Sequence, residues 1–163
     1  MKSYKKYMKL LSFLPAIFMM CIIFSFSSQT GEESGSLSYG ISWHLVQAAD
    51  KLTGSSLSQK EIHTWAEKIE HPIRKLAHMS EYFVFALTVT FPLWLYRIRG
   101  WKLFLITVLF CAAFAATDEF HQSFVGGRGP AVKDVFIDAF GAFLCACLVQ
   151  VIAKFRIKNR RTA

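Results

Sequence analysis

Cysteine is scarce in this sequence, and it offers no framework for disulfide bonds. The four cysteines, at positions 21, 111, 145 and 147, all lie inside apolar stretches. Thiols in such surroundings usually pack as small hydrophobic side chains. Cys145 and Cys147 are two residues apart, so on a helix their side chains diverge and cannot chelate a metal together. We therefore exclude a disulfide-stabilised domain and a metal site built on this cysteine pair.

Charge is absent over a long run, because no Asp, Glu, Lys, Arg or His lies between Lys9 and Glu32. Internal repeats, coiled-coil heptads and phosphate-cradling glycine motifs are absent as well. Apolar residues make up 53% of the 163 residues and mean hydropathy is +0.34, well above the values typical of soluble proteins. About 20 apolar residues cross a bilayer core, and four stretches approach this length: 10–27, 73–96, 101–122 and 131–153. The predicted fold class is all-α, a single domain forming a polytopic membrane bundle of four transmembrane helices.

Acidic residues are missing from the three segments where basic residues concentrate. These segments are the N-terminus, the linker YRIRGWK and the tail AKFRIKNRRTA, which together hold 12 of the 19 Lys and Arg residues. With four spans they fall on one face of the membrane, which the positive-inside rule identifies as cytoplasmic. We predict a multi-pass protein of the plasma membrane with both termini in the cytoplasm. This distribution accounts for the net charge of +8 and gives no reason to expect nucleic-acid binding.

Residues 28–72 form the long connection on the outer side. Its first part, SSQTGEESGSLSYG, is small and polar and is expected to be a loop. Two short amphipathic helices are expected to follow on the membrane surface, the first ending at Gly54 and the second capped by Ser58. The N-terminus resembles a signal peptide, but its apolar run is long for one, so we expect it to be retained. The segment VGGRGP is expected to turn before the last span, with Pro130 at the helix start.

The last three spans are short of apolar length. Their charge-free stretches, 82–96, 103–117 and 139–153, contain 15 residues each. Such a stretch covers only ~22 Å of a ~30 Å hydrocarbon core. On the cytoplasmic side Arg and Lys can reach water from within the lipid, but the outer ends continue into shorter acidic side chains. Because an unpaired charge in mid-membrane costs ~2.5–3.5 kcal/mol, the polar ends are expected to turn inward and meet.

Helical spacing allows each polar end to form one stripe. The stripes are Arg74, His78 and Glu81 on the second span, Asp118, His121 and Gln122 on the third, and Asp134, Asp138, Gly141 and Cys145 on the fourth. Topology places all three at the same depth, which predicts a shared polar pocket in the outer leaflet. A salt-bridge network that only holds helices together is the structural alternative, but such networks rarely repay their desolvation.

The same residues carry a resemblance to a known family. The segments IRKLAHMSEYFVFAL and DEFHQSFVGGRGPAVKDVFIDAFGA closely resemble the VanZ-like family of small bacterial membrane proteins, as does FSFSSQ at the end of the first span. The name-giving member of that family is linked to low-level resistance to the glycopeptide teicoplanin. The resemblance implies a role in the cell envelope and no particular mechanism. One position departs from the pattern, because Asp138 stands where the family often has Asn.

These residues support two main hypotheses. In the first, a membrane enzyme acts on an anionic envelope lipid or lipid-linked precursor, with general acid–base chemistry at the catalytic candidates His78, Glu81, Asp118, Glu119 and His121. In the second, a non-catalytic module binds such a head group, a glycopeptide or a partner protein. The ligand-binding candidates in both cases are Arg74, Lys75, Gln122, Arg128, Asp134 and Asp138.

Three further expectations concern other activities and partners. A proton relay or transporter would also use buried ionisable groups, but four spans without an inverted repeat disfavour it. The spacing permits a metal bound by His78, Glu81 and His121 with Asp118 or Glu119, yet the many nearby cations oppose this, and we expect neither a metal nor another cofactor. The expected partners are the bilayer and an anionic lipid head group, and the sequence leaves a homo-oligomer open.

Overall fold

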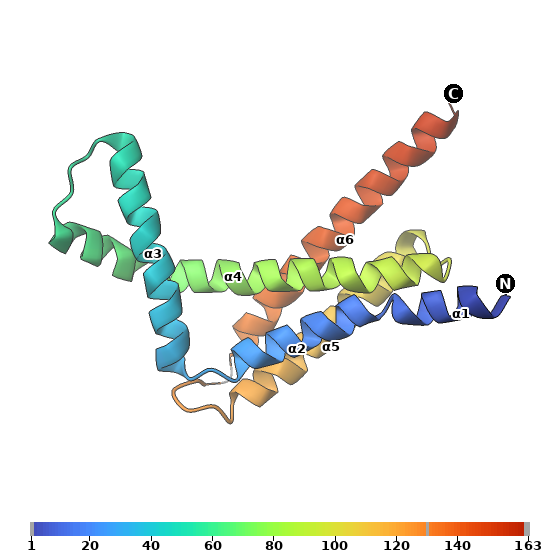
Figure 1. Cartoon of the computed structure of the whole chain (residues 1–163), viewed down its shortest axis with the longest axis horizontal. Coiled ribbons are helices and arrows are strands. Elements are labelled where there is room, and N and C mark those ends of the chain that lie inside the picture. The colour runs from blue at the N-terminus through green and yellow to red at the C-terminus, as the bar shows by residue number, and fades with distance from the viewer. Residues whose placement is uncertain (1, 130, 162–163) are drawn as a thin grey trace.

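The computed structural model describes residues 2–129 and 131–161, and the side chains of residues 7–129 and 131–155. Within these ranges the chain folds into helices and contains no strand, which confirms the all-α bundle. The six helices are α1 (Lys2–Leu11), α2 (Leu14–Ser27), α3 (Gly31–Thr53), α4 (Gln59–Leu95), α5 (Gly100–Gln122) and α6 (Val132–Arg161) (Figure 1). Four segments are long and apolar enough to cross a membrane: Tyr7–Ser27, Gln59–Leu95, Gly100–Gln122 and Val132–Phe155.

The first span is interrupted near its start. The sequence predicted one helix over 10–27, whereas α1 ends at Leu11 and α2 begins at Leu14. Pro15 lies in the first turn of α2, where its missing N–H costs no hydrogen bond. The Ser12 hydroxyl donates to the Lys9 carbonyl at 2.6 Å and satisfies one of the free carbonyls at the end of α1.

The outer connection is more helical than its composition suggested. The expected loop over residues 28–40 is wrong, because α3 begins at Gly31. Thr30 and Glu33 form a capping box, in which the Thr30 hydroxyl accepts from the Glu33 N–H and the Glu33 carboxylate accepts from the Thr30 N–H. These hydrogen bonds from the Thr30 backbone and side chain lower the pKa of Glu33. The cap outweighs the poor helix propensity of the Gly- and Ser-rich turns that follow.

The second expected surface helix is the beginning of α4. Ser58 caps it as predicted, with Glu61 completing a second capping box, and Gly54 ends α3 in the left-handed conformation at φ 67°. Helix α4 does not stop before the span. It continues through Pro72 to Leu95, so that it has 37 residues in all. Its first third therefore extends past the bundle, where α3 lies across it (Figure 1). The predicted helix start at Pro130 lies outside the described residues.

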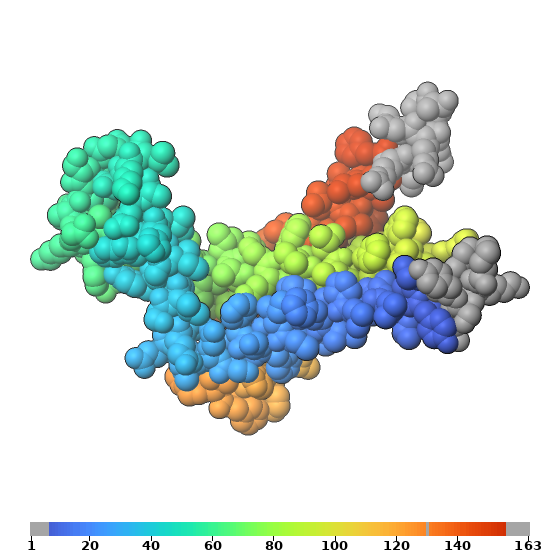
Figure 2. All heavy atoms as spheres, viewed as in Figure 1, coloured from blue at the N-terminus to red at the C-terminus, as the bar shows by residue number. Residues whose placement is uncertain are grey.

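Helix α4 is the centre of the bundle and packs against α2, α3, α5 and α6. The core around α4 contains aromatic side chains where α5 packs against it and small side chains where α6 packs against it. Tyr82 and Phe85 are fully buried against Phe114, while Ala142 and Cys145 are fully buried on α6. In the space-filling view α2 runs along the visible face of α4 (Figure 2).

The crossing of α4 and α6 depends on a glycine. A Cβ atom at Gly141 would overlap the Met79 carbonyl oxygen, so only glycine permits this backbone approach. The neighbouring Ala142, Cys145 and Ala146 continue the small surface of α6. Gly141, which belongs to the last polar stripe, thus lies where the backbones of the two helices approach each other closely.

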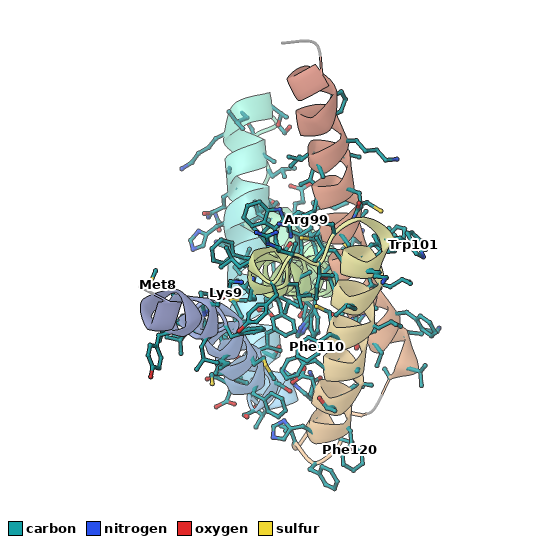
Figure 3. All side chains as sticks on the ribbon, turned by 90° about the vertical axis from the view of Figure 1, so that its right-hand side faces the viewer. Met8, Lys9, Arg99, Trp101, Phe110 and Phe120 are labelled. Atoms are coloured by element: carbon teal, nitrogen blue, oxygen red, sulfur yellow. The ribbon has the colours of Figure 1, made fainter. Side chains whose placement is uncertain are left out.

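The three basic segments lie at one end of the bundle. Both ends of the described chain and the α4–α5 turn are at the right of Figure 1. Figure 3 looks onto this end and shows Lys9 on α1, Arg99 between α4 and α5, and Trp101 at the start of α5. Such clustering of cations with an interfacial Trp is typical of one membrane face. The sequence-based assignment of that face to the cytoplasm stays a prediction.

The Gly141 contact can be tested by adding one methyl group. Gly141→Ala should push α6 away from Met79 and destabilise the bundle by ~1–3 kcal/mol, the usual cost of overpacking. Equilibrium unfolding in detergent measures this. Gly35→Ala is the matched control, because nothing lies within 4 Å of a Cβ there, and it should be neutral or stabilising. Equal stability of the two variants would show that the α4–α6 contact is not tight.

Candidate functional site

A polar pocket of about 220 Å³ lies at the end of the bundle opposite the basic segments. It is formed where α4 passes the start of α3, the end of α5, the loop 123–131 and the first turn of α6. Ten residues line it: Gly31, His71, Arg74, Lys75, His78, Gln122, Gly127, Arg128, Gly129 and Asp134. The structure therefore brings five of the six predicted ligand-binding residues to one cavity, together with His78.

Arg74 is held in place from α3. Its Nη2 atom lies 2.8 Å from Oε1 of Glu70, one turn earlier on α4. The same Glu70 oxygen accepts a 2.6 Å hydrogen bond from the buried Ser38 hydroxyl of α3. The buried Nε atom of Arg74 has no hydrogen-bond partner among the described residues. The guanidinium is thus positioned at the pocket with donor capacity to spare.

The loop 123–131 is anchored at both ends. Near α6, the Glu119 carboxylate accepts a 2.5 Å hydrogen bond from the Ala131 N–H. Near α3, the Gly31 N–H donates to the Gly126 carbonyl at 3.2 Å, and a Cβ at Gly31 would overlap the carbonyl oxygen of Gly127. These contacts fix the loop as the rim of the pocket.

Arg128 extends from this loop as a half-buried cation. Burial lowers the pKa of its guanidinium from the usual value, and the neighbouring charge of Arg74 acts in the same direction. Among the described residues Arg128 forms no ion pair, whereas Arg74 and Lys75 each have a carboxylate partner. Two arginines therefore line one pocket, and of the two only Arg74 has an ion-pair partner among the described residues, although the buried carboxylates of Glu81, Asp118 and Glu119 lie near enough to act on Arg128.

Lys75 and Asp134 form an ion pair that joins α4 to α6. Both side chains are about one quarter exposed, at 24% and 28%. Behind them lies a second cavity of about 10 Å³, lined by Lys75, His78, Glu119, Gln122, Asp134, Ile137 and Asp138. That volume is close to the minimum for one water molecule.

The deepest acidic groups are nearly inaccessible. Asp118 and Asp138 are 2% and 5% exposed, and Gln122 donates to Asp118 at 3.1 Å. Four buried oxygens have no hydrogen-bond partner among the described residues: Glu81 Oε2, the Tyr82 hydroxyl, Asp118 Oδ1 and Asp138 Oδ1. Leaving such groups unsatisfied is costly, so this layer is suited to hold water or protons under the pocket.

His78 and His121, the two predicted histidines, are separated. His78 lines the pocket, and its Nδ1 atom lies 3.7 Å from Oε2 of Glu81. His121 turns toward α2, where it lies 3.4 Å from the hydroxyl of the buried Ser27 and 5.0 Å from the Phe24 ring centre. The described residues include no group of three or more His, Cys, Asp and Glu side chains arranged to hold a metal.

Several residues that shape the site were missed from sequence. Glu70 is the clearest, because its spacing of four residues from Arg74 was visible as a helical ion pair. His71 also lines the pocket. Ser38 gave no signal, since its partner Glu70 lies 32 residues away along the chain. Ser27 lies in the segment FSFSSQ that resembles the family, but its partner His121, 94 residues away, was not predicted.

Comparison with known proteins gives one match. A family model described as VanZ/LLP1 matches residues 12–153 and so includes all five elements around the pocket. No curated protein and no solved structure matches the chain.

The Lys75–Asp134 pair should be energetically coupled. Lys75→Gln and Asp134→Asn are each expected to lower the free energy of unfolding. In the double variant the decrease should be smaller than the sum of the two single decreases by ~1 kcal/mol, as is usual for contacting groups. Unfolding in detergent measures this coupling. His63 and Glu67 form a control pair with side chains 55% and 61% exposed, where solvent should reduce the coupling to a fraction of that value. No coupling at Lys75 and Asp134 would contradict the ion pair.

Proposed function

The chain belongs to the VanZ/LLP1 family and is a multi-pass membrane protein, and from this premise we propose that its polar pocket binds the phosphate-bearing head group of an anionic envelope lipid or lipid-linked precursor. The family's association with glycopeptide resistance supports a setting in the cell envelope. In our proposal, any effect on teicoplanin susceptibility follows from engagement of such a lipid at the outer surface of the plasma membrane.

The position of Arg128 beside Arg74, without an ion pair of its own among the described residues, carries this proposal. Arginine guanidinium groups offer planar sets of donors that match phosphate oxygens. An anion between the two side chains would relieve their repulsion. A volume of about 220 Å³ is below the ~300–1,000 Å³ of sites for drug-sized molecules, which favours a head group over a whole lipid.

A second candidate function is hydrolysis or group transfer at the bound phosphate. The position of His78 supports it, because this side chain lines both the pocket and the water-sized cavity behind it. A histidine so placed can act as general base toward a water molecule, with Glu81 orienting the ring. His121, which faces α2, has no part in this version.

Head-group binding should depend strongly on Arg128. Arg128→Gln removes a charge-assisted contact of ~1.5–3 kcal/mol and should weaken binding of phosphatidic acid by about tenfold or more. Native mass spectrometry of the protein in detergent measures this, with diacylglycerol of the same chains as the phosphate-free lipid. Lys133→Gln is the matched control, since Lys133 is an exposed cation at the same end of the bundle and lies outside the pocket. Equal losses in both variants would indicate nonspecific attraction and sink the proposal.

Replacing His78 separates binding from catalysis. His78→Gln keeps a polar side chain in the wall and should change phosphatidic acid binding by less than about threefold if the site only binds. An enzyme should instead lose ~10²–10⁴-fold in turnover while still binding, the usual contribution of a general base. Release of phosphate or of a dephosphorylated lipid from vesicles containing the protein provides the readout. His121→Gln, outside the pocket, should leave both quantities unchanged.

A further inference from the structure

A third cavity adjoins the polar pocket, on the side of α3. This groove, of about 180 Å³, runs between α3 and α4 and has Phe26, Leu37, Ile41, Ile73 and Ala77 as its apolar walls. Arg74, His78 and Arg128 line both the groove and the polar pocket. The same three side chains thus lie between the polar pocket and the apolar groove.

The groove exists because α3 contacts α4 through small side chains. On α3, Ser38 and Ser42 are 6% and 0% exposed. On α4, Ala66 is fully buried. The larger apolar residues of α3 lie beside this contact and remain uncovered: Leu37 is 54% and Ile41 53% exposed. Figure 1 shows α3 lying across α4 at the pocket end of the bundle, and the exposed Leu37 and Ile41 of α3 both line the groove.

We propose that the groove holds the hydrocarbon chain of the lipid whose phosphate lies between Arg74 and Arg128. This inference rests on the proposed head-group site and specifies its ligand. Because the same residues line both cavities, a chain attached directly to the phosphate enters the groove without a spacer. The ligand class that fills both cavities is therefore a single-chain lipid phosphate, such as an alkyl or isoprenyl phosphate, whereas a diacyl phospholipid such as phosphatidic acid occupies the polar pocket with its phosphate alone.

Photolabelling tests where the chain lies. The probe is a long-chain alkyl phosphate with a diazirine in the chain, added to phosphatidylcholine vesicles containing the full-length protein. After irradiation, peptide mass spectrometry should find labels on Leu37, Ile41, Ile73 and Ala77 at least fivefold above those from the matching alcohol, which lacks phosphate. Arg128→Gln should bring the phosphate probe down to the alcohol level.

A bulky side chain in the groove should exclude the hydrocarbon chain of the lipid and leave binding of its phosphate unchanged. Ala77 is exposed on α4, so Ala77→Trp, or the smaller Ala77→Phe, is expected to fold and to reduce groove labelling at least fivefold. Leu76→Trp is the matched control, since Leu76 is 52% exposed and lies outside the groove, and it should label like the wild type. The short-chain probe butyl phosphate should still bind the Ala77 variants in native mass spectrometry.

The outcomes separate the two proposals. Binding of butyl phosphate together with labels spread over the lipid-facing surface would overturn the groove inference and leave the head-group site intact. Equal groove labelling by a diazirine-bearing phosphatidic acid would overturn the restriction to single-chain lipids. Failure of the wild type to bind any phosphate-bearing probe would overturn both proposals.

Discussion

The intolerance of hydrocarbon for unpaired polar groups organises this protein. Each of the last three spans has only 15 charge-free residues, too few to cross a bilayer core without polar residues at one end. The structure meets this constraint by turning the polar ends inward, so that Asp118 and Asp138 are buried and Lys75 pairs with Asp134. A pocket is the geometrical result, because charged side chains converging from three helices cannot pack as closely as apolar ones.

The position of that pocket depends on close packing lower in the bundle. Gly141 allows α6 to approach the Met79 carbonyl on α4, and on the other side of α4 the fully buried Tyr82 and Phe85 pack against Phe114 of α5. At the pocket end, residues Gly127, Arg128 and Gly129 of the following loop line the space between the helices. The apolar core thus holds together the helices that carry the polar residues of the pocket.

Much of this arrangement was predictable, because membrane burial leaves a strong pattern in sequence. The spans and the inward stripes, including the position of Gly141 on the last one, followed from helical periodicity and the spacing of charges. The start of α3 was missed because its composition is typical of a loop, although Thr30 and Glu33 have the spacing of a capping box. His121 was assigned to the stripe of Asp118 and Gln122; it lies on the α2 side of that stripe, beside Ser27, and does not line the pocket with Gln122, because successive residues differ by about 100° around a helix. Contacts such as Ser38 with Glu70 depend on how α3 lies across α4, which no local pattern specifies.

The hydrogen bond between the Gly31 N–H and the Gly126 carbonyl ties the beginning of α3 to the loop that carries Arg128. Helix α3 therefore cannot move away from the bundle without breaking this hydrogen bond or displacing the loop with it. The position of the Arg128 backbone is thereby coupled to that of a helix whose first residue is 97 positions earlier in the chain.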